Sequence, residues 1–447
     1  MNELQFDFEW ENPMGAAAPE LAATWAHLVI RVNETLVTQV HDYGARSVRD
    51  GIYLPLYPMA EWLVMHWWPL LHEPEVPRRA SHRDYPQRHN LRFAREGFAL
   101  PSLTFRPLNG KIGLDWRSVD FSACGVRFLQ EGSTVFDSEG VKDAVTRLIE
   151  SVVGRLEIEG IRGTPLQEEW QAILEAGSEE RQFCKVAGTL GLDPYSLTEE
   201  GQASIIRVAE DLPAELADDF FAIADFTDLA AQATRLQAGL EVVRTQDANL
   251  VPLQELRGRL EKIDPLRTPW AEGYALARQL RKDFHLEGRT ARTVEDVGSF
   301  LGLSPRDLTS AVVSWQGDDQ ALAFAPGHSV RFYDALVGTN ELGSPGFLLQ
   351  KQHESSRTFA FCRALFEYLT AATGPVALIS SALSERQKRN RAFAAEFLAP
   401  AEMLQETVSG SLLDSEEVED LAAQFGVSIY VIRHQLENHH LAQVMEG

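Results

Sequence analysis

Residues 393–400 read Phe-Ala-Ala-Glu-Phe-Leu-Ala-Pro, and they close a helix that we expect to begin at Ser384. The helix ends before Pro400, because proline lacks a backbone N–H group and its ring clashes with the preceding turn. A longer helix is predicted just upstream, from about Ser355 to Ala371. These two helices identify the C-terminal part of the chain as its most informative region.

The elements that precede these two helices come in a definite order. Two helices are predicted first, at Trp270–Phe284 and Thr293–Leu301. Two extended runs follow them, Gln320–Ala325 and Val330–Tyr333, each after a glycine-containing turn. The predicted order is therefore helix, helix, strands, long helix, and a helix that ends in proline.

This order and the run at 393–400 resemble the ImmA/IrrE family of metallopeptidases. The family carries a near-identical FAAxLLMP run on the helix that follows its metal-binding helix. Gly273–Arg281 is similar to the first helix of the family. The resemblance covers about residues 268–441 and implies a zincin-like domain.

An active member of this family needs a helix with the motif His-Glu-x-x-His. The two histidines bind Zn²⁺ from one helix face, and the glutamate takes a proton from the zinc-bound water. When Phe359 is aligned with a family phenylalanine, the resemblance places Arg363 at the first histidine, Ala364 at the glutamate and Glu367 at the second histidine. Because a guanidinium has no lone pair to offer a metal, we expect a degenerate site with no catalytic residue and no cofactor.

A second register of the motif starts at His353 and Glu354, but it places Arg357 where the second histidine must be. His353 and Glu354 could instead form a relocated pair of metal ligands. Adjacent residues on a helix face different ways, which favours an ordinary loop or helix start.

The substituted residues also predict how the former metal site is filled. Arg363 and Glu367 are four residues apart on one helix, so their side chains can meet. We expect this pair, with Glu385 or Arg389 of the next helix, to form a salt-bridge network that needs full hydrogen bonding if it is buried. The alternative is that both side chains reach solvent.

The C-terminal segment from Leu421 to Leu436 reads as helix, tight turn, helix. Gly426 suits the end of the first helix, and Ser428 can cap the second. This spacing is that of a helix-turn-helix. The first helix is acidic and the second offers only Arg433 and some histidines, so we favour a structural hairpin over a DNA reader.

The rest of the chain divides into two further predicted domains. Residues 1–135 contain alternating and turn-bounded runs such as Leu28–Asn33, Ser102–Arg106 and Gly110–Trp116, which predict a small β-rich module. A helix from Met59 to Trp68 is predicted to stop at Pro69. Residues 136–264 have helical apolar spacing throughout and predict a helical middle. The predicted fold class is α+β and helix-rich, with the zincin-like domain at 265–447.

One stretch of this acidic chain is strongly basic. It runs from Pro74 to Arg95, is predicted to be a surface loop, and includes Arg83, Arg88 and Arg92. These arginines could bind nucleic acid or an acidic surface. They could equally pair with acidic residues of the same chain.

Composition limits the possible partners and the setting. The 65 acidic residues exceed the 41 Lys and Arg residues, and the formal charge of −24 disfavours binding to nucleic acid. The three cysteines form no CxxC pair, and no apolar run is long enough for a membrane helix. We expect a cytoplasmic protein with no membrane partner.

The sequence thus favours a non-catalytic, ImmA/IrrE-like regulatory protein that binds a protein or peptide. The resemblance implies a bacterial role in stress response, mobile-element control or phage defence. Two alternatives stay open: an active zinc peptidase with unconventional ligands that cleaves a regulator, and a nucleic-acid-binding regulator.

Overall fold

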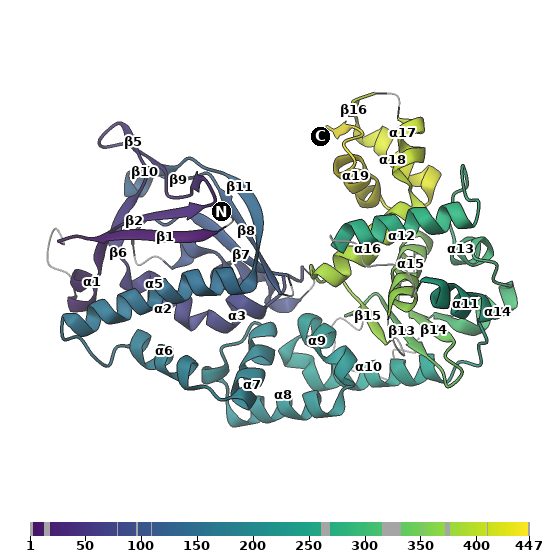
Figure 1. Cartoon of the computed structure of the whole chain (residues 1–447), viewed down its shortest axis with the longest axis horizontal. Coiled ribbons are helices and arrows are strands. Elements are labelled where there is room, and N and C mark those ends of the chain that lie inside the picture. Colours follow the sequence, from purple (N-terminus) through teal and green to yellow (C-terminus); the bar gives the residue numbers. More distant parts are fainter. Residues whose placement is uncertain are drawn as a thin grey trace. The chain divides into compact units, whose positions relative to one another are not determined.

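The computed structural model describes residues 3–12, 18–77, 79–94, 97–108, 110–260, 269–314, 332–351, 353–371, 376–408 and 410–445. The fold is mixed α+β and contains more helix than strand, as predicted. The chain divides into two compact units, Met1–Arg207 and Val208–Gly447 (Figure 1).

The first unit begins with an alternation of short strands and helices and continues with longer helices. Its strands are β1 (Leu4–Trp10), β2 (Trp25–Val32), β3 (Thr35–Leu36), β4 (Val40–Asp42), β5 (Ser47–Arg49), β6 (Ile52–Pro55), β7 (Ser102–Pro107), β8 (Lys111–Arg117), β9 (Val119–Phe121), β10 (Val126–Phe128) and β11 (Gly132–Asp137). Its helices are α1 (Pro19–Ala23), α2 (Tyr57–Met65), α3 (Trp67–His72), α4 (Tyr85–His89), α5 (Ser138–Ile158), α6 (Pro165–Glu175) and α7 (Ser178–Thr189), and α8 (Glu199–Asp211) crosses the division.

The described strands of this unit form three antiparallel sheets. Their orders are β1-β2-β3 with β6 beside β2, β5-β4-β10-β9, and β11-β8-β7. Every second side chain of β2 is buried, as the alternation at Leu28–Asn33 predicts. Helix α5 packs its apolar face, including Val141 and Leu148, against β1, β8 and β11 (Figure 1).

Two predictions for the first unit were wrong. The helix that was expected to stop at Pro69 instead ends at Met65, and α3 restarts at Trp67 with Pro69 in its first turn. Proline fits there because first-turn N–H groups need no helical partner. The stretch from Pro74 to Arg95 is not simply a surface loop, since it contains α4 and buries Tyr85 and His89.

The second unit is a small sheet surrounded by helices. Its strands are β12 (Val312–Ser314), β13 (Ala335–Thr339), β14 (Pro345–Leu349), β15 (Ala377–Ile379), β16 (Leu412–Leu413) and β17 (Gln443–Val444). Its helices are α9 (Ala214–Ile223), α10 (Leu229–Arg244), α11 (Val251–Leu260), α12 (Pro269–Asp283), α13 (Val294–Phe300), α14 (Pro305–Ala311), α15 (Glu354–Thr370), α16 (Glu385–Leu398), α17 (Ala401–Thr407), α18 (Ser415–Phe425) and α19 (Ile429–Asn438).

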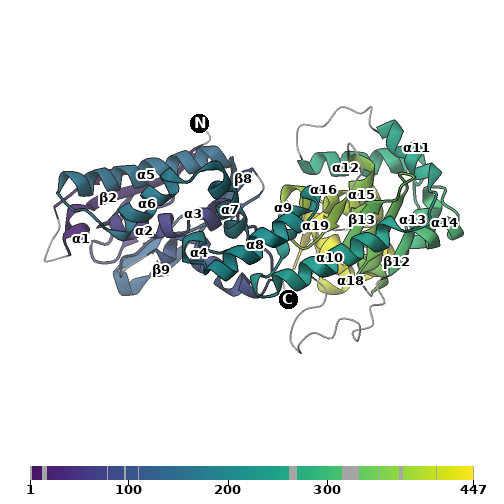
Figure 2. The same ribbon diagram turned by 90° about the horizontal axis from the view of Figure 1, so that it is seen from below.

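The central sheet of this unit has the strand order β12-β14-β13-β15 and is antiparallel except for the β12–β14 pair. Helices α10 and α15 both pack on its strands, and Figure 2 shows α10 running along β13. A Cβ at Gly346 would collide with the backbone of Val243 on α10. The absence of a side chain at Gly346 thus lets the helix approach the sheet closely.

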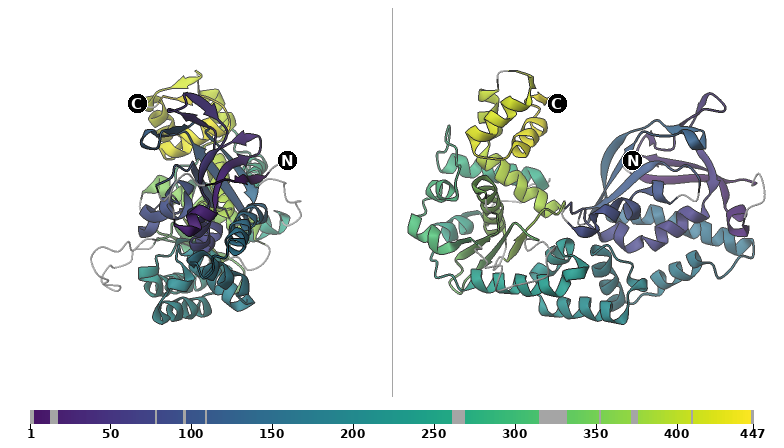
Figure 3. Two further views of the ribbon diagram at one scale, coloured as in Figure 1. Left: turned by 90° about the vertical axis from the view of Figure 1, so that its left-hand side faces the viewer. Right: turned by 180° about the vertical axis from the view of Figure 1, so that it is seen from behind.

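Helices α15 and α16 carry the sequence features that define this unit, and α12 lies along α16 (Figure 1). The predicted bounds of these three helices differ from the observed bounds by one residue. Gly273 on α12 faces the backbone of α16, where a Cβ would collide with the carbonyl oxygen of Arg389. The C-terminal helices α17 to α19 follow α16 and share the hydrophobic core of the same unit (Figure 3).

The strands of the second unit were largely missed. The predicted run Gln320–Ala325 and the start of Val330–Tyr333 lie outside the described residues. Strands β13 and β14 are almost wholly buried, so they show no alternation of polar and apolar residues.

The predicted domain limits at 135/136 and 264/265 also differ from the observed division, because α5 packs on the first unit's sheets and α10 on the second unit's sheet.

Candidate functional site: an arginine-centred polar network beside a pocket

Helix α15 carries two charged side chains deep in the core of the second unit. Arg363 is 3% exposed and Glu367 is 6% exposed, among neighbours that include Phe361, Leu365 and Phe366. A charge in such a position is stable only when it is paired and hydrogen-bonded. The partners of these two residues therefore define the site.

The guanidinium of Arg363 donates hydrogen bonds to helix α16 and to residues beside the ends of strands β13 and β15. Its Nε donates to Asn390 Oδ1 at 2.7 Å, and one terminal nitrogen donates to Asp334 Oδ2 at 3.1 Å. The other donates to the Ser380 carbonyl and to Gln387 Oε1, each at 2.6 Å. This geometry ties α15 to α16 and to the ends of β13 and β15.

Glu367 continues the same network one turn further along α15. It accepts hydrogen bonds from Asn390 Nδ2 at 2.8 Å and from Arg386 Nε at 2.9 Å. Arg386 also forms an ion pair with Asp219 of α9. Asn390 thus bridges Arg363 and Glu367.

The network exists, but its partners from α16 differ from the two residues that were expected. Arg389 pairs with Glu272 of α12 at 3.0 Å, and Glu385 lies half-buried at the first position of α16. The inward positions are instead Gln387 and Asn390, which are 1% and 0% exposed. The helical period turns residue 389 toward α12 and residues 387 and 390 toward α15.

The side chains at the predicted motif positions do not fit a zinc ion. The Arg363 guanidinium can only donate hydrogen bonds, whereas zinc needs a lone pair from its ligand. Ala364 is fully buried and has no group that could move a proton. Among the described residues, no three His, Cys, Asp or Glu side chains lie close enough to share a metal ion.

His353 and Glu354 lie at the start of α15, where both are exposed. Glu354 pairs with Arg357 at 3.4 Å, and His353 is the residue that precedes the first helical turn. His353 and Glu354 therefore occupy an ordinary, exposed helix start.

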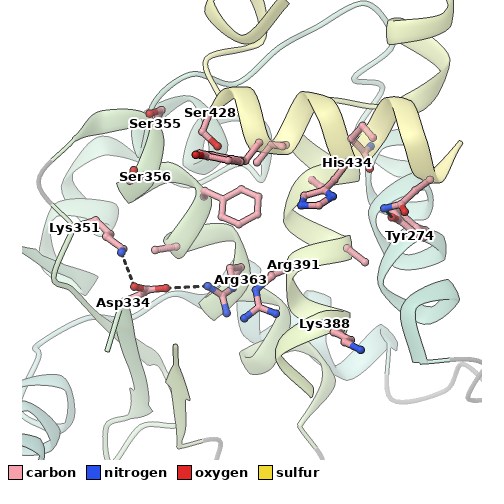
Figure 4. Close-up of a pocket in the computed structure, with 18 residues that line it drawn as sticks. Tyr274, Asp334, Lys351, Ser355, Ser356, Arg363, Lys388, Arg391, Ser428 and His434 are labelled. Carbon is pink, nitrogen blue, oxygen red and sulfur yellow. Dashed lines mark hydrogen bonds and ion pairs between the residues drawn. The ribbon is translucent and has the colours of Figure 1, made fainter. Parts of the chain in front are cut away.

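A pocket of about 680 Å³ lies beside the network, between α12, α15, α16 and α19 (Figure 4). Its charged side chains are mostly basic: Lys351, Arg363, Lys388 and Arg391 line it, and Asp334 is the one acidic residue among the described lining residues. Lys351 Nζ lies 2.6 Å from Asp334 Oδ1, so this carboxylate is shared between Lys351 and Arg363. The pocket is thus positively charged in an acidic chain.

The C-terminal helix pair covers this pocket. Gly426 ends α18 in the left-handed conformation with φ 69°, as predicted, whereas the Ser428 side chain makes no capping hydrogen bond to α19. Val431, His434 and Gln435 of α19 line the pocket (Figure 4). One face of α19, the helix that would read DNA in a helix-turn-helix, therefore lines the pocket, and Arg433 is half-buried.

The basic stretch of the first unit is drawn into internal contacts. Arg88 makes a bidentate pair with buried Glu73, at 2.8 and 2.6 Å, and His89 also contacts that carboxylate. The guanidinium of Arg92 lies over the rings of Phe93 and Phe121. Arg83 is exposed, and Arg78 and Arg95 lie outside the described residues.

Glu73 is a strongly held charge at the centre of this cluster. Burial alone would raise the pKa of Glu73, but hydrogen bonds from Arg88 and His89 outweigh burial and lower the pKa to about 2. Arg88 therefore serves as the internal partner of the buried Glu73 carboxylate.

Comparisons with known proteins give no match: none of the family models, curated proteins or solved structures compared with this chain matches it. Within the described residues, no helix is both long and apolar enough to cross a membrane.

Sequence reasoning missed Gln387, Asn390 and the pocket cations Lys388 and Arg391. One available signal was the spacing of Gln387 and Asn390 from Ala394 and Phe397, which puts all four on one buried helix face. A polar pair in line with core residues indicates a buried polar network.

Proposed function

We propose that this chain is a non-catalytic regulatory protein related to the ImmA/IrrE metallopeptidases. Its second unit is the zincin-like part, and it binds a protein or peptide partner instead of cutting one. The role that we infer lies in the bacterial cytoplasm, in stress response, mobile-element control or phage defence.

The observation that carries this proposal is the environment of Arg363. The side chain stands where the resemblance requires the first zinc-binding histidine, and its hydrogen bonds occupy Asn390, Asp334 and Gln387. The polar groups around Arg363 are already hydrogen-bonded to it, and removing one of them would leave the others unpaired. The network therefore differs from an empty metal site, whose ligands would be free to bind an ion. It supports a scaffold that has kept its helices and exchanged metal binding for internal polar contacts.

The arrangement of the helices gives further support. The long helix α15 packs on the sheet, α16 crosses beside it and ends next to Pro400, and α12 lies along α16. The close approach at Gly273 requires a residue without a side chain at that point of α12. This glycine and the run at 393–400 are both part of the stretches that resemble the family.

A cleavage assay on the purified full chain tests the proposal. We expect no cleavage of an unfolded protein substrate such as casein after incubation with zinc, and no effect of a chelator. Cleavage that a chelator abolishes would overturn the proposal and favour an active peptidase with unconventional ligands.

The nucleic-acid alternative has less support from the contacts. Arg88 is paired with Glu73, and α19 has one face on the pocket. Retention of the chain on DNA that weakens with salt, and that is lost when Arg83 and Arg92 are changed to Gln, would favour that alternative.

A further inference from the structure

The pocket beside the network concentrates positive charge where the chain as a whole is negative. Its walls carry Lys351, Arg363, Lys388 and Arg391, against the single carboxylate of Asp334 among the described lining residues. The chain has 65 acidic residues and 41 Lys and Arg residues, so a cavity with this balance differs from its surroundings. A positive cavity with low-dielectric walls focuses its field on a bound anion.

Arg391 is a pocket cation that is bonded to backbone carbonyl oxygens and not to a carboxylate. Its hydrogen bonds go to the carbonyl oxygens of Ser380 and Ala382, and no carboxylate among the described residues lies within ion-pair distance of it. Burial, and then the charge of Arg363, lower the pKa of Arg391 to about 9. Figure 4 shows Arg391 next to Arg363 at the base of the pocket.

The other walls suit the body of a ligand. Phe359, Ala392, Ala395 and Val431 give the pocket an apolar side, and Ser355, Ser356 and Ser428 stand together near the starts of α15 and α19 (Figure 4). A cavity of 680 Å³ has the size of ordinary ligand sites, which are mostly apolar with a few fixed polar groups.

We propose that this pocket binds a phosphate or carboxylate group, which Arg391 and Lys388 hold at its base while the apolar wall contacts the rest of the ligand. Arg363 stays bonded within the network and contributes its charge. The ligand is either a small molecule or a peptide segment of the partner. This inference rests on the proposed function only in treating the pocket as a binding site without metal.

Calorimetric titration of the full chain tests the inference. The probes are phenyl phosphate, inorganic phosphate, the capped tripeptides Ala-Asp-Ala and Ala-phosphoserine-Ala, and neutral benzyl alcohol. We expect at least one anionic probe to bind and benzyl alcohol not to bind. Binding of the phenyl phosphate alone would identify a small-molecule site, and binding of a tripeptide would identify a peptide site.

Three variants locate the binding. Arg391→Gln and Lys388→Gln should each weaken the anionic probe about tenfold, because each removes one charge-assisted contact. Arg306→Gln is the matched control: it removes one positive charge from an exposed position of the same unit and should leave affinity unchanged. If Arg391→Gln does not fold, Lys388→Gln decides.

The inference is overturned if no anionic probe binds up to about 5 mM, or if Lys388→Gln binds as tightly as the control. These outcomes are separate from a failure of the proposed function, which would appear as chelator-sensitive cleavage in the assay without any probe.

Discussion

Asn390 accepts a hydrogen bond from Arg363 at 2.7 Å, and its amide nitrogen donates to Glu367 at 2.8 Å. One neutral side chain therefore satisfies a buried cation and a buried anion that stand one turn apart on α15. Both contacts use the atoms that an amide provides, an acceptor oxygen and a donor nitrogen. The stability of the second unit should depend on this residue.

Asn390→Ala should lower the free energy of unfolding by about 1–3 kcal/mol, because it leaves Arg363 Nε and a Glu367 oxygen without their partner. Urea unfolding followed by tryptophan fluorescence or circular dichroism measures the change. Asn438→Ala is the control, because Asn438 is exposed and its amide nitrogen donates a long hydrogen bond, 3.3 Å, to the Tyr274 hydroxyl at the surface. Equal stability of the two variants would contradict the bridging role.

Arg363→Ala should cost more, about 3–5 kcal/mol, since it leaves Asp334, Asn390 and Gln387 facing a cavity in the core. The measurement is again the free energy of unfolding in urea. Arg306→Ala, at an exposed site of the same unit, should change it by less than about 0.5 kcal/mol. A small effect of Arg363→Ala would mean that the network does not stabilise the fold.

The sequence predicts the charged residues of α15 at this site but not their hydrogen-bond partners. The residues of α15 could be predicted, because Arg363 and Glu367 interrupt an apolar helix at a spacing of four residues. The partners could not, because the choice between Arg389 and Asn390 depends on the rotation of α16 about its own axis. Asp334 and Asp219 come from distant segments that only the fold brings near.

The same reasoning holds for the fold. Helices α12 and α16 were predictable because Pro269 marks the start of the first, and Ser384 and Pro400 mark the ends of the second. Helix α15 was predictable from the helical spacing of its apolar residues. Strands β13 and β14 were not, because strands buried on both faces lack alternation. The polar composition of the stretch from Pro74 to Arg95 indicated a loop. In the structure, Arg88 and His89 of this stretch contact the buried Glu73 carboxylate and attach α4 to the first unit.

Glu73 predicts an acid-sensitive contribution to stability in the first unit. Its pKa in the folded chain is about 2, below the usual 4.5, so the folded state favours the charged form. The stabilisation, about 3 kcal/mol, is fully present above pH 4.5 and is lost as the pH falls through about 2. Unfolding of Glu73→Gln between pH 2 and pH 7 should lack this dependence, with an exposed Glu157→Gln variant of the same unit as the control.

A retained acid dependence in Glu73→Gln would mean that other carboxylates dominate the acid response. A loss of the acid dependence in the Glu157→Gln control would point the same way.

Gly273→Ala should destabilise the packing of α12 on α16 by about 1–3 kcal/mol, because the new Cβ meets the carbonyl oxygen of Arg389. Gly258→Ala on α11 is a matched control, since its Cβ would enter open space and alanine favours helix. The difference between the two melting temperatures measures the effect. A Gly273→Ala variant as stable as Gly258→Ala would show that the two helices can separate without cost.

The most direct test of the metal-free account is the zinc content of the purified chain and of one variant that rebuilds the motif. The variant combines Arg363→His, Ala364→Glu, Glu367→His and Asn390→Asp, which places two imidazoles and a carboxylate on the facing sides of α15 and α16. We expect elemental analysis after zinc exposure and gel filtration to find no stoichiometric zinc in the natural chain and about one zinc per folded variant chain. Stoichiometric zinc in the natural chain, or none in a folded variant, would contradict the account.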